Sequence, residues 1–122
     1  MKKLDKPKDY LFFRKGGRIG ATFNLNITRY VDEFGNEYYE YTSVDVFPLS
    51  YDNTVSTIMN SLYPSDKVQA LTANYNEARD DEELSEEKRK EYMDEYHAYQ
   101  SKRKEIKALA KEIMEEVTHG KV

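Results

Sequence analysis

The C-terminal third of the chain predicts one helix that is long for so small a protein. From Ser85 to Thr118 there are 34 residues without Pro or Gly, and Gly120 then supplies a stop signal. Ser85 is a suitable N-cap, and Glu86 and Glu87 follow it where the helix dipole favours negative charge. At 1.5 Å per residue this helix is about 50 Å long. The remaining residues must cover it, or part of it projects.

One face of this helix carries a stripe with the spacing of a coiled coil. Its members are alternately four and three residues apart: Tyr92, Tyr96, Tyr99, Arg103, Ile106, Ala110, Ile113 and Val117. The sequence leaves two arrangements open, in which the helix packs on the rest of the domain or pairs with another subunit. We expect core packing for residues 106–117 and an intermolecular contact for residues 92–99, although the reverse assignment fits the same stripe.

Residues 9–47 predict a three-stranded antiparallel meander. The middle strand has apolar side chains at every second position, which specifies one buried and one wet face: Ile19, Ala21, Phe23, Leu25 and Ile27. Gly16-Gly17 and Phe34-Gly35-Asn36 supply turns to flanking strands at 9–15 and 38–47. Pro48 ends the last strand.

Residues 50–75 predict a pair of short helices. Apolar residues recur at helical spacing after Ser50 or Asp52, which are candidate N-caps, and Pro64 separates the two helices so that Ser65 can cap the second. Residues 76–84 read as an acidic linker. The predicted fold class is therefore α+β, with a three-stranded antiparallel meander followed by two short helices and one long C-terminal helix. We assign a flexible basic arm to residues 1–8 and a single domain to residues 9–122, with the long helix at 85–118.

Charge is distributed unevenly along the chain. The net charge is −4, yet residues 1–18 carry +5 and the remainder −9. One interpretation is that the basic arm docks on an acidic protein surface, such as residues 77–87 of another copy. Another is that it contacts nucleic acid, with Tyr10, Phe12 and Phe13 as stacking rings. The acidic pI of about 5.3 makes nucleic acid the less favoured partner.

The sequence nominates no chemical site. It has no Cys, which excludes disulfides, thiolate metal sites and cysteine nucleophiles, and it has only two His. Glu91, Asp94 and Glu95 lie near His97, but clustered carboxylates on a helix are usually a solvated face. We therefore expect no catalytic residues, no cofactor and no metal, and an interaction protein rather than an enzyme.

The middle of the chain carries a resemblance. The segments Tyr51-x3-Val55-Ser56-x-Ile58, Leu62-Tyr63-Pro64-Ser65-Asp66, Val68-Gln69-Ala70-Leu71 and Asn74-Tyr75 are similar to a module in small uncharacterised proteins of gut Bacteroidales phages and prophages. The likeness spans about residues 44–112, and Pro64 departs from the pattern. It implies a phage setting, as a virion component or an assembly factor, and it brings no catalytic residues.

The leading hypothesis is a virion-associated structural or accessory protein that acts by protein–protein contact and forms a homo-oligomer. Alternatives are an assembly chaperone or host-directed inhibitor, and a nucleic-acid-binding accessory protein that uses the basic arm. No apolar stretch approaches the roughly 20 residues of a membrane helix, so we expect no membrane partner and a location in the virion or the host cytoplasm. The candidate interaction residues are Tyr92, Tyr96, Tyr99 and Arg103 on the helix, and Lys2, Lys3, Lys6 and Lys8 on the arm.

Overall fold

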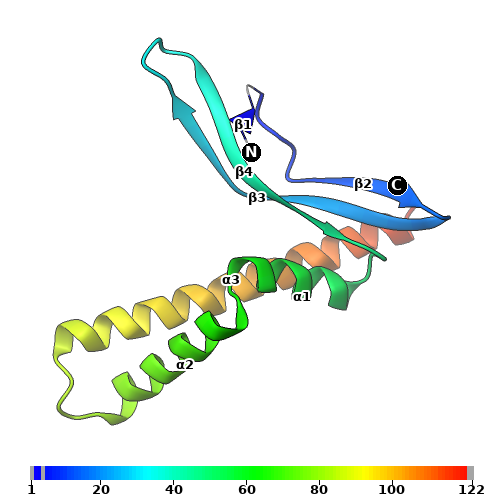
Figure 1. Cartoon of the computed structure of the whole chain (residues 1–122). Helices are drawn as coiled ribbons and strands as arrows, with labels where there is room; N and C mark the ends of the chain where they lie inside the picture. The colour runs from blue at the N-terminus through cyan, green and yellow to red at the C-terminus, as the bar shows by residue number, and fades with distance from the viewer. Residues whose placement is uncertain (1, 4, 121–122) are drawn as a thin grey trace.

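The computed structural model describes residues 2–3 and 5–120 and shows an α+β fold, in which an antiparallel sheet lies over a layer of helices (Figure 1). The strands are β1 (Lys2–Lys3), β2 (Tyr10–Lys15), β3 (Arg18–Val31) and β4 (Glu37–Val46). The helices are α1 (Tyr51–Leu62), α2 (Ser65–Asp80) and α3 (Glu86–Thr118). The predicted succession of a meander, two helices and a long helix is confirmed.

The sheet has the strand order β1-β4-β3-β2, with every pair antiparallel. Gly16 and Gly17 join β2 to β3 with φ values of +59° and +79°, the left-handed backbone that a tight hairpin turn between twisted strands requires. β1 is an addition to the predicted meander. Lys2 lies opposite Glu40 and Lys3 opposite Tyr39, so the backbone of the arm we expected to be flexible contributes two residues to the sheet.

A β-bulge divides β3 into two halves. Leu25 lies opposite Thr42 and Thr28 opposite Glu40, so β3 uses one residue more than β4 over this interval. Asn26 takes up the irregularity with φ +55°, a conformation that Asn tolerates better than most residues. On one side of the bulge β3 lies over the helices, and on the other the β3–β4 hairpin projects past them (Figure 1).

The core forms between one face of the sheet, α1 and the C-terminal half of α3. The alternation predicted in β3 is confirmed by Ala21, Phe23 and Leu25, which are buried. The helices contribute residues from the predicted apolar positions, and all of these pack into one cluster with Val46 of β4: Ile58, Met59, Ile106 and Ile113. The stripe of α3 is therefore buried from Ile106 to Ile113, whereas Val117 at its end is half-buried.

The N-terminus of α1 is capped as expected. The Ser50 hydroxyl accepts from the Asn53 N–H at 3.0 Å, and the buried Thr54 hydroxyl donates to the Ser50 carbonyl at 2.7 Å. The prediction for α2 was wrong in one detail. The carbonyl of Pro64 already accepts from the Val68 N–H at 3.1 Å, so Ser65 is the first helical residue and its side chain does not cap the helix.

The helix α2 extends to Asp80, well into the segment expected to be an acidic linker. Two contacts with α3 explain the extra length. Ala78 is completely buried, and the Arg89 guanidinium donates to the carbonyl of Ala78 and, at 3.0 Å, to the carbonyl of Asp81. These bonds satisfy carbonyls that the end of a helix leaves without a partner. The turn to α3 is correspondingly short, and Ser85 caps α3 as predicted, accepting from the Lys88 N–H at 3.2 Å.

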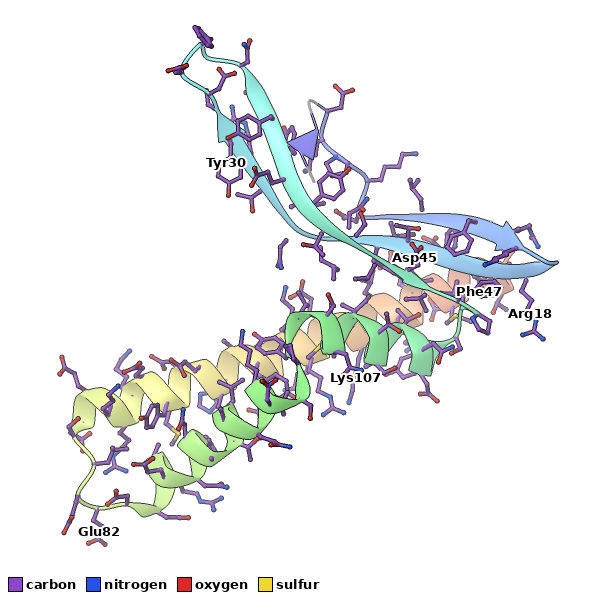
Figure 2. All side chains as sticks on the ribbon, in the orientation of Figure 1. Arg18, Tyr30, Asp45, Phe47, Glu82 and Lys107 are labelled. Carbon is purple, nitrogen blue, oxygen red and sulfur yellow. The ribbon has the colours of Figure 1, made fainter. Side chains whose placement is uncertain are left out.

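Two hairpins thus extend from a shared core (Figure 1). The β3–β4 hairpin projects from the sheet, and the α2–α3 hairpin projects from the helical layer, with Glu82 at its acidic end (Figure 2). The β2–β3 turn lies at the opposite end of the molecule from Glu82 and carries Arg18 (Figure 2).

Candidate interaction surfaces

Two of the three tyrosines predicted to meet another molecule contact their own chain, Tyr96 at α2 and Tyr99 at the connection between α1 and α2. Tyr96 stacks on Tyr75, with ring centroids 4.3 Å apart and planes 23° from parallel. Tyr99 meets Tyr63 edge to face, with centroids 5.0 Å apart. Tyr92, Tyr96 and Tyr99 are all half-buried. Any contact of these rings with another molecule is limited to the parts that stay exposed, because α2 packs against the projecting half of α3.

Arg103 is the one charged member of the stripe, and it is exposed. It lines a groove of about 630 Å³ between α1 and α3, with Lys107 beside it and Tyr51 and Asp52 on the opposite side. A smaller hollow of about 230 Å³ brings Arg103 next to Tyr99 and other residues of α3. Arg103 therefore interrupts the stripe where α3 faces solvent between its contacts with α1 and α2.

The basic N-terminal residues are spread over the sheet. Lys2 and Lys3 lie opposite β4, whereas Lys6 and Lys8 are exposed in the segment that leads to β2. The Lys8 carbonyl accepts from the Asn24 side-chain amide at 2.7 Å, which fixes this segment beside β3. Along the backbone, the basic arm is thus divided between β1, at the β4 edge of the sheet, and the segment that leads to β2 at the other edge.

The rings of β2 point to opposite faces of the sheet. Tyr10 and Phe12 pack against the core, and the Tyr10 hydroxyl donates to Glu116 Oε1 on α3 at 2.8 Å. Phe13 faces away from the helices and stacks on Phe47, with centroids 6.0 Å apart. The three rings considered as a stacking platform for nucleic acid therefore do not share one surface.

Tyr10 gives the stability of the protein a specific pH dependence. Burial, followed by the hydrogen bond to Glu116, raises the pKa of Tyr10 from 10.0 to about 12. The folded state then holds a proton that the unfolded chain releases, so the free energy of unfolding falls as pH rises from 10 towards 12. We expect the advantage of the wild type over Tyr10→Phe to decrease by about 1–2 kcal/mol across this window, measured by urea unfolding. Tyr51→Phe removes an exposed hydroxyl and is the control. Parallel stability curves for the wild type and Tyr10→Phe would contradict the assignment.

The tip of the β3–β4 hairpin, residues 30–37, is the surface that sequence reasoning missed. Phe34 is 81% exposed, Val31 53% and Tyr30 41%, the first being the highest value among the large apolar side chains described. Tyr30 lies on the projecting hairpin (Figure 2). It stacks on Tyr38 of the other strand, with centroids 5.3 Å apart and planes 18° from parallel. The available signal was Phe34 itself, a large apolar residue placed in a turn.

The turn at this tip is well ordered by hydrogen bonds. The Asp32 carboxylate accepts from the N–H groups of Phe34 and Asn36, both at 2.9 Å, and the Asp32 N–H donates to the Asn36 carbonyl at 2.9 Å. Gly35 has φ +82°, which favours glycine, and its N–H donates to the Asp32 carbonyl. The backbone that carries Phe34 is thus held in one conformation before any partner binds.

Within the described part of the chain, no group of three or more His, Asp or Glu side chains is placed to hold a metal ion. None of the helices found there combines the length and apolar character that a bilayer span requires. Comparisons with protein-family models, with curated proteins and with solved structures found no match. The resemblance to small phage proteins stays a prediction, and the functional argument depends on the surfaces described above.

Proposed function

We propose that this protein is a virion-associated structural or accessory protein that binds another protein through the hairpin tip. The observation that carries the proposal is Phe34, a large apolar ring that is 81% exposed on a hydrogen-bonded turn. Exposing such a ring to water is unfavourable, and a buried aromatic anchor is the feature that most often dominates a protein interface. The phage setting comes from the resemblance of residues 44–112.

The charge and the exposed apolar ring of the tip indicate what kind of surface the partner presents. Residues 30–37 contain Asp32, Glu33 and Glu37 and no basic residue. Arg29 forms an ion pair with Glu37 at the base of the tip, so the remaining negative charge near Phe34 comes from Asp32 and Glu33. Charge complementarity favours a partner with an apolar pocket bordered by Lys or Arg. Because the turn is already ordered, little conformational entropy is lost when Phe34 enters that pocket.

Site-specific photo-crosslinking in infected cells tests this proposal. A benzophenone side chain at position 34 is expected to crosslink to a protein that is also found in purified particles. The same group at Tyr51, which is exposed on α1 away from the hairpin tip, is the control. An absence of adducts at position 34, or identical adducts from both positions, would exclude the tip as the docking site. Adducts to proteins absent from particles would favour the assembly chaperone or host-directed inhibitor.

With the partner in hand, Phe34→Ala is expected to weaken binding by about 2 kcal/mol or more, roughly 30-fold, as truncation of an interface anchor does. The comparison is Val31→Ala, which removes a smaller exposed side chain from the same tip. Binding is measured by titration calorimetry. Equal losses for the two variants would mean that Phe34 is not the anchor.

A further inference from the structure

The free edge of the sheet at β2 is built to pair with another strand. β2 is the last strand in the order β1-β4-β3-β2, so its outer edge has no neighbour within the described chain. Its centre, Tyr10 to Phe13, is uncharged, aromatic and free of Pro, as in strands that pair readily. Leu11 is 50% exposed on the face of the sheet away from the helices. Such an edge favours pairing with a strand of another chain.

The register of β2 and β3 decides which backbone groups point to this edge. Lys15 and Arg18 flank a two-residue turn and so form a hydrogen-bonded pair, and such pairs alternate along an antiparallel ladder. The same alternation makes Asp9 and Asn24 a hydrogen-bonded pair, and the Asn24 N–H does donate to the Asp9 carbonyl at 2.9 Å. The odd-numbered residues of β2 therefore bond to β3. The N–H and C=O groups of Tyr10, Phe12 and Arg14 point outward.

Symmetry limits how two copies of β2 can meet. A twofold axis perpendicular to the sheet keeps the helices of both copies on one face, so residues opposite each other must come from the same strand face. Among the registers that satisfy this condition, those with the greatest overlap of residues 9–15 place Leu11, Phe12 or Phe13 opposite its own counterpart. The side-chain charges distinguish these three registers.

Centring on Phe12 places Asp9 opposite Lys15 of the second copy, and the symmetry repeats this pair of opposite charges. It also brings Arg14 of the second copy opposite Tyr10, whose hydroxyl is bonded to Glu116. Leu11 then faces Phe13 of the second copy on the open face of the sheet. Centring on Leu11 would instead place Lys8 opposite Arg14, a like-charge pair, and centring on Phe13 creates no ion pair.

We propose that β2 pairs antiparallel with β2 of a second copy about a twofold axis at Phe12, which joins two sheets into one continuous sheet. Pairing satisfies the outward backbone groups with about six hydrogen bonds between copies. The interface is small, so we expect a weak dimer with a dissociation constant on the order of 10 µM. The hairpin tip takes no part in it.

A charge exchange tests the register. Lys15→Glu places two acidic residues opposite each other and is expected to weaken dimerisation at least about tenfold. Adding Asp9→Lys restores opposite charges in reverse and is expected to return the dissociation constant to within about threefold of wild type. Both are measured by sedimentation equilibrium of the full chain. A double variant as weak as Lys15→Glu would overturn the proposed pairing.

Arg14→Pro tests the edge directly. Position 14 is exposed and its N–H points away from β3, so proline there spares the β2–β3 ladder and removes one outward donor. The variant is expected to keep the circular dichroism spectrum of wild type and to be monomeric. A wild type that stays monomeric at about 500 µM, or an Arg14→Pro variant that still dimerises, would refute the inference. Phe34→Ala should dimerise like wild type, so failure of the hairpin-tip proposal is distinguishable.

Discussion

Replacing Phe23 by alanine is expected to lower the free energy of unfolding by about 3–5 kcal/mol. Phe23 is 1% exposed and lies in the cluster where β3 meets α1 and α3, so truncation removes a whole ring from the centre of the core. The side chains of this cluster come from four different elements, β3, β4, α1 and α3, and cannot all move inward together. The resulting cavity adds to the lost transfer free energy.

The chain supplies a matched control for this prediction. Phe34→Ala makes the same chemical change at a position that is 81% exposed, and it is expected to alter stability by no more than about 0.5 kcal/mol. Urea unfolding monitored by circular dichroism measures both variants. Similar losses for Phe23→Ala and Phe34→Ala would contradict the placement of the core.

Proline at position 100 is expected to cost about 3 kcal/mol or more, because it removes a backbone hydrogen bond and clashes inside a helix. Gln100 is exposed and lies within α3, between the residues that contact α2 and those that contact the sheet. The loss therefore reports on the continuity of the helix rather than on side-chain packing. It is measured by thermal and urea unfolding.

Gln100→Ala is the control, since it keeps the backbone hydrogen bond and exchanges one good helix former for a better one. Its stability is expected to equal or slightly exceed that of the wild type. If Gln100→Pro were as stable as Gln100→Ala, α3 would not be one continuous helix across this position.

The spacing of apolar residues along the sequence correctly predicted the elements that bury one face in the core. The alternation in β3 identified Ala21 and Phe23 as core, and the stripe in α3 identified Ile106 and Ile113. In each case burial of one face imposes the period of the element on the sequence. The caps at Ser50 and Ser85 were also predictable, because their hydroxyls satisfy local N–H groups.

Features that depend on a second element were not predictable in this way. A stripe shows that a face is covered but not by what, so the partner of Tyr96 could be found only once α2 was placed beside it. The C-terminal turn of α2 has the composition of an acidic linker, and its helical state depends on Arg89, eleven residues beyond Ala78. The exposure of Phe34 depends on how far the hairpin extends past the helices.

The bulge in β3 has a consequence for how this protein could change during evolution. Deleting Ile27 would let Leu25 remain opposite Thr42 and Thr28 remain opposite Glu40, with the intervening residues paired one to one. Core pairing on one side and the Phe34 turn on the other would both survive. What would change is the extra twist and bend that a bulge introduces. Loss of a single codon would therefore change the direction in which the tip points without changing its side chains. Such a deletion is one way for the protein to stay matched to a partner whose binding site has moved.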